Sequence, residues 1–119
     1  MCIKMEINKK KIIALNKKFG GSVINESGLD FAIEMANREK NLFKSNAYII
    51  RGIILDHPFL DGNKRTATTI IARRFAEHNI ACDEKKLVKS IVNIAKKNIH
   101  SIMKISKKLR KCCKKIKNK

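Results

Sequence analysis

The chain has 119 residues, 44% of them apolar, and a formal net charge of +18. This length suits one domain, because domains usually run to about 100–200 residues, and the apolar share excludes a wholly disordered chain. No apolar run approaches the roughly 20 residues of a membrane-spanning helix, and the N-terminus lacks the apolar core of a secretory signal. We therefore predict a soluble, cytoplasmic protein.

The positive charge is concentrated in the last third of the chain. Residues 1–84 hold 14 Lys or Arg and ten Asp or Glu, whereas residues 85–119 hold 14 Lys or Arg and no acid. This excess favours either a negatively charged partner, such as nucleic acid or an anionic surface, or a solvated helical face that ends in a frayed tail. The stretch has almost no aromatic side chains for stacking on bases, which favours the solvated face.

Apolar spacing predicts three helices in the first half of the chain. The first covers residues 7–18 and ends at a pair of glycines, and the second begins at Asn25 as its N-cap. The third covers residues 43–56 and ends before Pro58. Because it is apolar nearly all round, we expect this third helix to be the buried centre of the fold.

Three more helices are predicted in the second half. The fourth runs from residue 63 to about 78 and turns Arg73, Arg74 and Glu77 toward solvent. Asp83 caps the fifth, and a break near residues 98–101 separates it from the last; one continuous helix from Asp83 onward is the alternative. No stretch alternates with the period of two that indicates a strand. We therefore predict an all-α domain over residues 1–113, followed by a basic, disordered tail over residues 114–119.

The cysteines give no sign of a metal site. They form no CxxC pair and match no zinc signature; they are Cys2, Cys82, Cys112 and Cys113. In a cytoplasmic protein we expect them to be reduced thiols.

The stretch that carries chemistry lies between the third and fourth helices and reads His-Pro-Phe-Leu-Asp-Gly-Asn-Lys-Arg, residues 57–65. Asp61 and Gly62 signal a turn, and Asn63 can cap the helix that follows. The unpaired N–H groups of that helix start, its dipole and the cations Lys64 and Arg65 favour an anion site, most naturally for phosphate.

Two more side chains of this stretch suit phosphoryl chemistry. Asp61 offers a hard oxygen ligand for a Mg²⁺ ion that bridges phosphate oxygens. His57 is a workable general base. Together they favour phosphoryl or nucleotidyl transfer; the alternative is an ordinary helix–loop–helix corner with a solvated aspartate and a surface histidine.

The stretch resembles the signature of the Fic/Doc (Fido) family, His-x-Phe-x-Asp/Glu-x-Asn-x-Arg. The matching residues are His57, Phe59, Asp61, Asn63 and Arg65. Finer details are similar to the Doc branch, the death-on-curing toxins: Lys64 replaces the glycine of typical Fic loops, and Thr68 replaces their second arginine. The resemblance extends over residues 7 to about 110.

This resemblance implies an all-α Fido-type bundle of about six helices, whose catalytic loop lies between two central helices. Fic members transfer AMP from ATP to a protein hydroxyl. Doc-type members instead transfer the terminal phosphate, to a threonine of the translation elongation factor Tu, and a small antitoxin keeps them silent. The implied cofactors are ATP and Mg²⁺.

The resemblance also assigns roles to residues of this chain. His57 becomes the base that takes the proton of the target hydroxyl, Asp61 the Mg²⁺ ligand, and Phe59 the anchor of the loop in the core. Phosphate binding is assigned to Gly62, Asn63, Lys64 and Arg65. Of these, Gly62 and Asn63 supply an anion hole.

We therefore predict a Doc-like toxin-type kinase that moves the γ-phosphate of ATP to a Ser or Thr hydroxyl of a protein. AMP transfer is the alternative, and it ranks second because the chain lacks the second arginine of Fic loops. A third reading is a catalytically degenerate scaffold that binds nucleic acid or an acidic partner through residues 85–119. Family members also dock targets on a strand-like flap between the second and third helices; here that region, residues 37–45, is short and polar.

Overall fold

A computed structural model describes residues 6–116. Within this range the chain forms six α-helices, one π-helical turn and a two-stranded antiparallel sheet. In chain order these are α1 (Lys9–Lys18), α2 (Glu26–Arg38), α3 (Leu42–Ile50), η1 (Arg51–Leu55), α4 (Asn63–Glu77), β1 (Ile80–Cys82), α5 (Glu84–Lys97), α6 (Ile102–Cys112) and β2 (Cys113–Lys115). The predicted all-α bundle of about six helices is confirmed, with the small sheet added to it.

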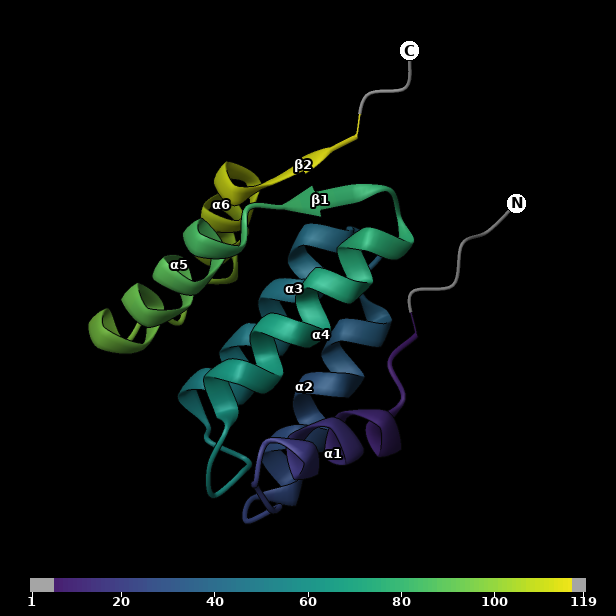
Figure 1. The fold of residues 1–119 in the computed structure, drawn as a ribbon, viewed down its shortest axis with the longest axis vertical. Coiled ribbons are helices and arrows are strands. Elements are labelled where there is room, and N and C mark those ends of the chain that lie inside the picture. The colour runs from purple at the N-terminus through teal and green to yellow at the C-terminus, as the bar shows by residue number, and fades with distance from the viewer. Residues whose placement is uncertain (1–5, 117–119) are drawn as a thin grey trace.

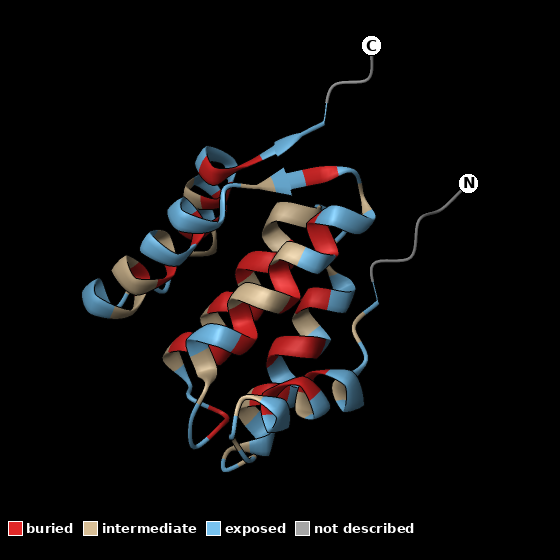
Figure 2. Ribbon diagram, in the orientation of Figure 1, coloured by how far each residue is buried: buried red, intermediate tan, exposed pale blue. Residues whose placement is uncertain are grey.

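The helix α3, continued by η1, and the helix α4 form the centre of the bundle (Figure 1). The helices α2 and α6 pack against α3, α5 packs against α4 and α6, and α1 lies across one end. Figure 2 shows buried residues along α2, α3 and α4 in the middle of the molecule. The third predicted helix is the buried centre as expected, since Ile49, Ile50, Ile53 and Ile54 are at most 1% exposed. No described helix is long and apolar enough to cross a membrane.

The caps predicted for the second and fifth helices begin those helices. The side chain of Asn25 accepts a hydrogen bond from the Gly28 N–H at the start of α2, and that of Asp83 accepts one from the Lys86 N–H at the start of α5. The helix α5 ends at Asn98, which has a left-handed φ of 53°, and Ser101 caps α6. The break between the last two helices is therefore confirmed, and the continuous helix is wrong.

Arg74 is buried in the core, contrary to the prediction that it faces solvent. It is 8% exposed, and its guanidinium donates hydrogen bonds to Asn46 Oδ1 and, over 3.0 Å, to Ser45 Oγ, both on α3. Burial lowers the pKa of Arg74 to about 10. Helical periodicity alone could not show this, because the acceptors that make a buried arginine tolerable lie 28 and 29 positions away.

The small sheet joins the end of α4 to the end of α6. Cys82 of β1 faces Cys113 of β2, and the two form a disulfide, so the expectation of reduced thiols is wrong for this pair. Cys112 is a buried free thiol, and Cys2 lies outside the described residues. Lys114 and Lys115, which we expected in a disordered tail, belong to β2; residues 117–119 of that tail lie outside the described residues.

Candidate functional site

The predicted motif begins in the connection between η1 and α4, residues 56–62, at one end of the two central helices (Figure 1). The ring of Phe59 is 1% exposed and belongs to the hydrophobic core, as expected of an anchor for the loop. His57, Leu60 and Asp61 are exposed. The loop is thus held by two buried residues, Pro58 and Phe59, and turns the side chains of His57 and Asp61 outward.

The helix α4 begins without a side-chain cap. Its N-cap is Gly62, whose left-handed φ of 73° suits glycine, and a Cβ there would lie 3.2 Å from Asn16 Nδ2 and 3.3 Å from Phe19 Cβ. The other five α-helices of the described chain are each capped by an Asn, Asp or Ser side chain. Within the described chain, the N–H groups of residues 63–65 donate no hydrogen bond. They are therefore available to an anion.

Asn63 is the first residue of α4 rather than its cap, which corrects the sequence prediction. Its side chain accepts a hydrogen bond from the Phe59 N–H over 3.2 Å and donates one to the Phe59 carbonyl oxygen over 2.8 Å. The side chain thereby closes the loop against the start of α4. Only the backbone N–H of Asn63 remains for an anion.

A cavity of about 440 Å³ lies over the loop. The predicted site residues other than the anchor all line it, namely His57, Asp61, Gly62, Asn63, Lys64 and Arg65. Phe19, from the end of α1, completes one wall, and the Arg65 guanidinium lies 5.0 Å from the centre of its ring. This cation–π contact holds the Arg65 side chain at the cavity while leaving its N–H groups able to donate.

The carboxylate of Asp61 is half committed to the loop itself. Its Oδ1 accepts a hydrogen bond from the Gly62 N–H over 2.7 Å, and its second oxygen has no hydrogen-bond partner in the described chain. Proteins bind Mg²⁺ through one or two carboxylates together with the phosphate oxygens of a substrate. Asp61 offers a single carboxylate with a free oxygen beside the unpaired N–H groups of α4, and this arrangement fits such a Mg²⁺ site.

Asn16 supports the loop and was missed by sequence analysis. Its side chain is 1% exposed, and Nδ2 donates to the Asp61 carbonyl oxygen over 2.8 Å and to Thr66 Oγ1 over 3.1 Å. These partners lie 45 and 50 positions along the chain, so no local motif marks them. The one signal was position: Asn16 follows Ile12 by four residues and so falls on the apolar stripe of α1.

An extended segment between α1 and α2 also lies along the loop. Val23 faces Phe59 in an antiparallel bridge, with hydrogen bonds of 2.8 Å from the Ile24 N–H to the Pro58 carbonyl oxygen and from the Leu60 N–H to the Ser22 carbonyl oxygen. The connection between α2 and α3 is at the other end of α2 (Figure 1). The strand-like segment beside the loop is therefore residues 22–24, not the region 37–45 considered from the sequence.

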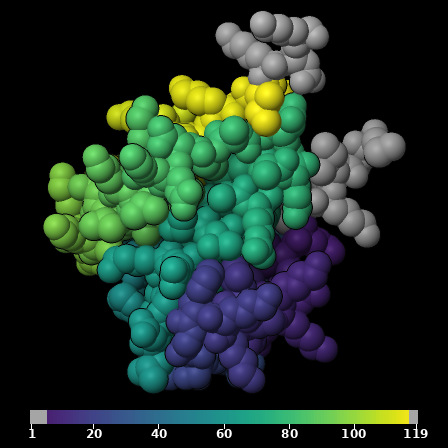
Figure 3. Space-filling model, in the orientation of Figure 1, coloured from purple at the N-terminus to yellow at the C-terminus, as the bar shows by residue number. Residues whose placement is uncertain are grey.

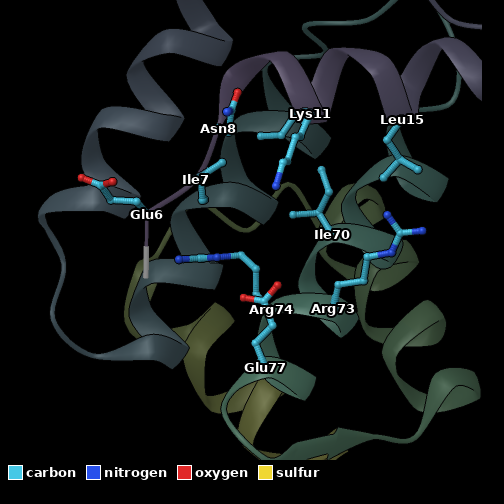
Figure 4. Close-up of a pocket in the computed structure, with 10 residues that line it drawn as sticks. Glu6, Ile7, Asn8, Lys11, Leu15, Ile70, Arg73, Arg74 and Glu77 are labelled. Carbon is cyan, nitrogen blue, oxygen red and sulfur yellow. The ribbon is translucent and has the colours of Figure 1, made fainter. Parts of the chain in front are cut away.

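A separate cavity of about 230 Å³ lies between α1 and α4. Lys11 of α1 and Arg73 of α4 project toward it (Figure 4), and Glu6 and Glu77 also line it. It shares no lining residue with the cavity over the loop, so it is not part of the candidate site.

Comparison with known proteins gives one finding. A family model described as Fic/DOC family matches residues 11–73, which is more than half of the chain and includes the whole motif. Neither curated proteins nor solved structures gave a match. The family match begins within α1 and ends within α4, and it includes every residue that lines the cavity over the loop. On this evidence the chain belongs to the Fic/DOC family.

Proposed function

We propose that the protein transfers the γ-phosphoryl group of ATP to a Ser or Thr hydroxyl of another protein. Membership of the Fic/DOC family supports a transferase that uses a nucleotide and acts on proteins. The observation that carries the proposal is the uncapped start of α4, whose unpaired N–H groups lie at the same cavity as Lys64 and Arg65. Such a helix start stabilises bound phosphate through its N–H groups and its dipole.

His57 is the proposed general base. It is exposed at the cavity, and its ring makes no hydrogen bond within the described chain, so a ring nitrogen is open to a proton. In the step, the acceptor oxygen bonds to the γ-phosphorus while the bond from that phosphorus to the β–γ bridging oxygen breaks. The hydroxyl proton passes to His57, and ADP leaves.

The charges of the remaining residues suit the phosphates. Asp61 would hold Mg²⁺ through its free carboxylate oxygen, and the bound ion would neutralise phosphate charge. Lys64 and Arg65 add two cations at the same cavity. Arg65 is oriented by the ring of Phe19, which lowers the entropy that it loses on binding a phosphate.

Thr68 favours transfer of the γ-phosphoryl group over transfer of AMP, and with it the Doc-like branch. It stands where Fic-type loops resembling this one have their second arginine. Its hydroxyl donates a hydrogen bond of 2.8 Å to the Lys64 carbonyl oxygen within α4. This position therefore provides no cation for a second phosphate group.

The segment Ser22–Ile24 is the proposed docking site for the target peptide. One edge of this segment pairs with the loop, whereas the N–H and C=O groups of Val23 make no backbone hydrogen bond in the described chain. An extended peptide can add to that edge by strand pairing and present its hydroxyl to the cavity. By resemblance to Doc-type members, we propose a translation elongation factor as the target and an antitoxin as the natural inhibitor.

Transfer of labelled phosphate tests this function. The purified protein is incubated with Mg²⁺ and ATP labelled on the α- or the γ-phosphorus, with elongation factor or whole-cell lysate as acceptor. We expect γ label alone on a protein, and a loss of about 10²- to 10⁴-fold in the rate for His57→Ala, the usual contribution of a general base. His100→Ala is the matched control, because His100 is exposed in the connection between α5 and α6 and lines no part of the cavity. Transfer of α label, or undiminished transfer by His57→Ala, would contradict the proposal.

A further inference from the structure

The helices α5 and α6 carry much of the excess positive charge of the chain and lie side by side at one edge of the molecule (Figures 1 and 3). Six of their lysines define what we call the basic face. All six are exposed: Lys85, Lys89 and Lys96 on α5, and Lys104, Lys107 and Lys111 on α6.

The basic face is a consequence of how each helix packs. On α5 the buried residues are Leu87, Ile91 and Ile94. At 3.6 residues per turn, the opposite side of the helix holds Lys85, Lys89 and Lys96. On α6 the buried side is Ile105, Ser106, Leu109 and Cys112, and its lysines are again opposite. Both helices thus turn their apolar residues to the core and a row of lysines to solvent.

No acidic side chain neutralises this surface. Every ion pair of the described chain lies elsewhere, between Lys9 and two acids of α2 and between Arg38 and Glu34. The nearest acids in sequence, Asp83 and Glu84, are confined to the start of α5. The lysines therefore repel one another, and a partner with regularly spaced negative charge relieves that repulsion.

The chemistry of the basic face selects among anionic partners. An anionic membrane is disfavoured, because the apolar stripes of both helices are used in the core. The large apolar side chains that they leave exposed are Val88 and Met103, one on each helix, which is too few for an inserting apolar face. Single-stranded nucleic acid is disfavoured, because residues 84–116 contain no Phe, Tyr or Trp on which bases could stack. Lysine is a flexible point charge that contacts phosphate without reading bases. Rows of lysines on two packed helices suit the regular phosphate backbone of a duplex.

We propose that the basic face binds the phosphate backbone of double-stranded nucleic acid, without sequence preference. This binding is separate from phosphoryl transfer, because no lysine of the basic face lines the cavity over the loop.

The test is a salt titration of binding to a fluorescent 20-base-pair DNA duplex, followed by anisotropy. Each phosphate contact adds about 0.9 to the slope of log affinity against log salt concentration. We expect the variant with Lys85→Gln, Lys89→Gln and Lys96→Gln to lower that slope by about 2–3 and to bind at least about tenfold more weakly near 0.1 M salt. The control variant carries Lys10→Gln, Lys18→Gln and Lys40→Gln, three exposed lysines outside α5 and α6, and loses the same charge.

The control should bind the duplex as the unchanged protein does, and circular dichroism should show both variants folded. Two results would overturn the proposal. In one, the two variants lose affinity equally, so that net charge alone attracts the duplex. In the other, polyglutamate of matched charge displaces the duplex at equal concentration of charges, which would make an acidic protein the fitting partner.

Discussion

Gly62 sets the direction of the N–H groups that begin α4. Its left-handed φ of 73° turns the chain from the loop into the helix, and a Cβ there would lie 3.2 Å from Asn16 Nδ2 and 3.3 Å from Phe19 Cβ, slightly closer than ordinary contact. Gly20 has a similar φ of 82° but open space around it. Alanine at Gly20 introduces backbone strain away from the anion site, whereas alanine at Gly62 introduces it at the site. Comparing the two substitutions therefore separates the two effects.

We predict that Gly20→Ala loses about 1–2 kcal/mol of unfolding free energy, the usual penalty of a left-handed residue with a Cβ, and that Gly62→Ala loses at least as much, because its Cβ also crowds Asn16 and Phe19. Only Gly62→Ala should weaken binding of Mg-ATP, by tenfold or more, because it alone moves the N–H groups of α4. Urea unfolding measures the first quantity and calorimetric titration the second. Equal nucleotide affinity in the two variants would show that Gly62 does not shape the binding site.

Single residues were predictable from the sequence where the chemistry is local. His57, Asp61, Lys64 and Arg65 stand within nine positions, and the structure brings them to one cavity. Asn16 could not be assigned in this way, because its role consists of hydrogen bonds to Asp61 and Thr66. A buried polar residue on an apolar stripe implies that a partner exists but does not say which one.

At the scale of elements, three helix starts were predictable, whereas the cap of α4 and the strands were not. Asn25, Asp83 and Ser101 cap their helices through side-chain hydrogen bonds to the third residue on, a local rule that sequence expresses directly. The strands β1 and β2 have three residues each, which is too short to show alternation. They exist because α6 returns the chain to the end of α4, a consequence of tertiary packing.

The disulfide between Cys82 and Cys113 of this small sheet should contribute measurably to the free energy of unfolding. It closes a loop of 31 positions and ties β2 to β1. We predict that reduction lowers the free energy of unfolding by about 2–4 kcal/mol, mainly by freeing the unfolded chain. Urea unfolding with and without a phosphine reductant measures this, and Cys82→Ser should unfold at one midpoint in both conditions. Coincident curves for oxidised and reduced forms of the unchanged protein would contradict the prediction.

At the scale of the whole molecule, the helix α5 connects the candidate site to the basic face. Glu84 and Val88 of α5 line a groove of about 360 Å³ together with Lys64 and Arg65 of α4. The helix α5 therefore borders the candidate site with one side and carries three lysines of the basic face on another. The family match ends at residue 73, before β1, α5 and α6 begin. The basic face therefore lies outside the part of the chain that matches the family model.

The central claim is that the γ-phosphoryl group of ATP is transferred. Its most direct test is to identify which bond of ATP breaks. Phosphorus NMR can follow ATP, ADP, AMP and pyrophosphate together while the purified protein acts on its acceptor in the presence of Mg²⁺. Transfer of the γ-phosphoryl group predicts ADP in proportion to the modified acceptor, with no pyrophosphate, and turnover that is about 10²- to 10⁴-fold slower for His57→Ala. Pyrophosphate released in proportion to the modified acceptor would show AMP transfer instead and would contradict the role given to Thr68.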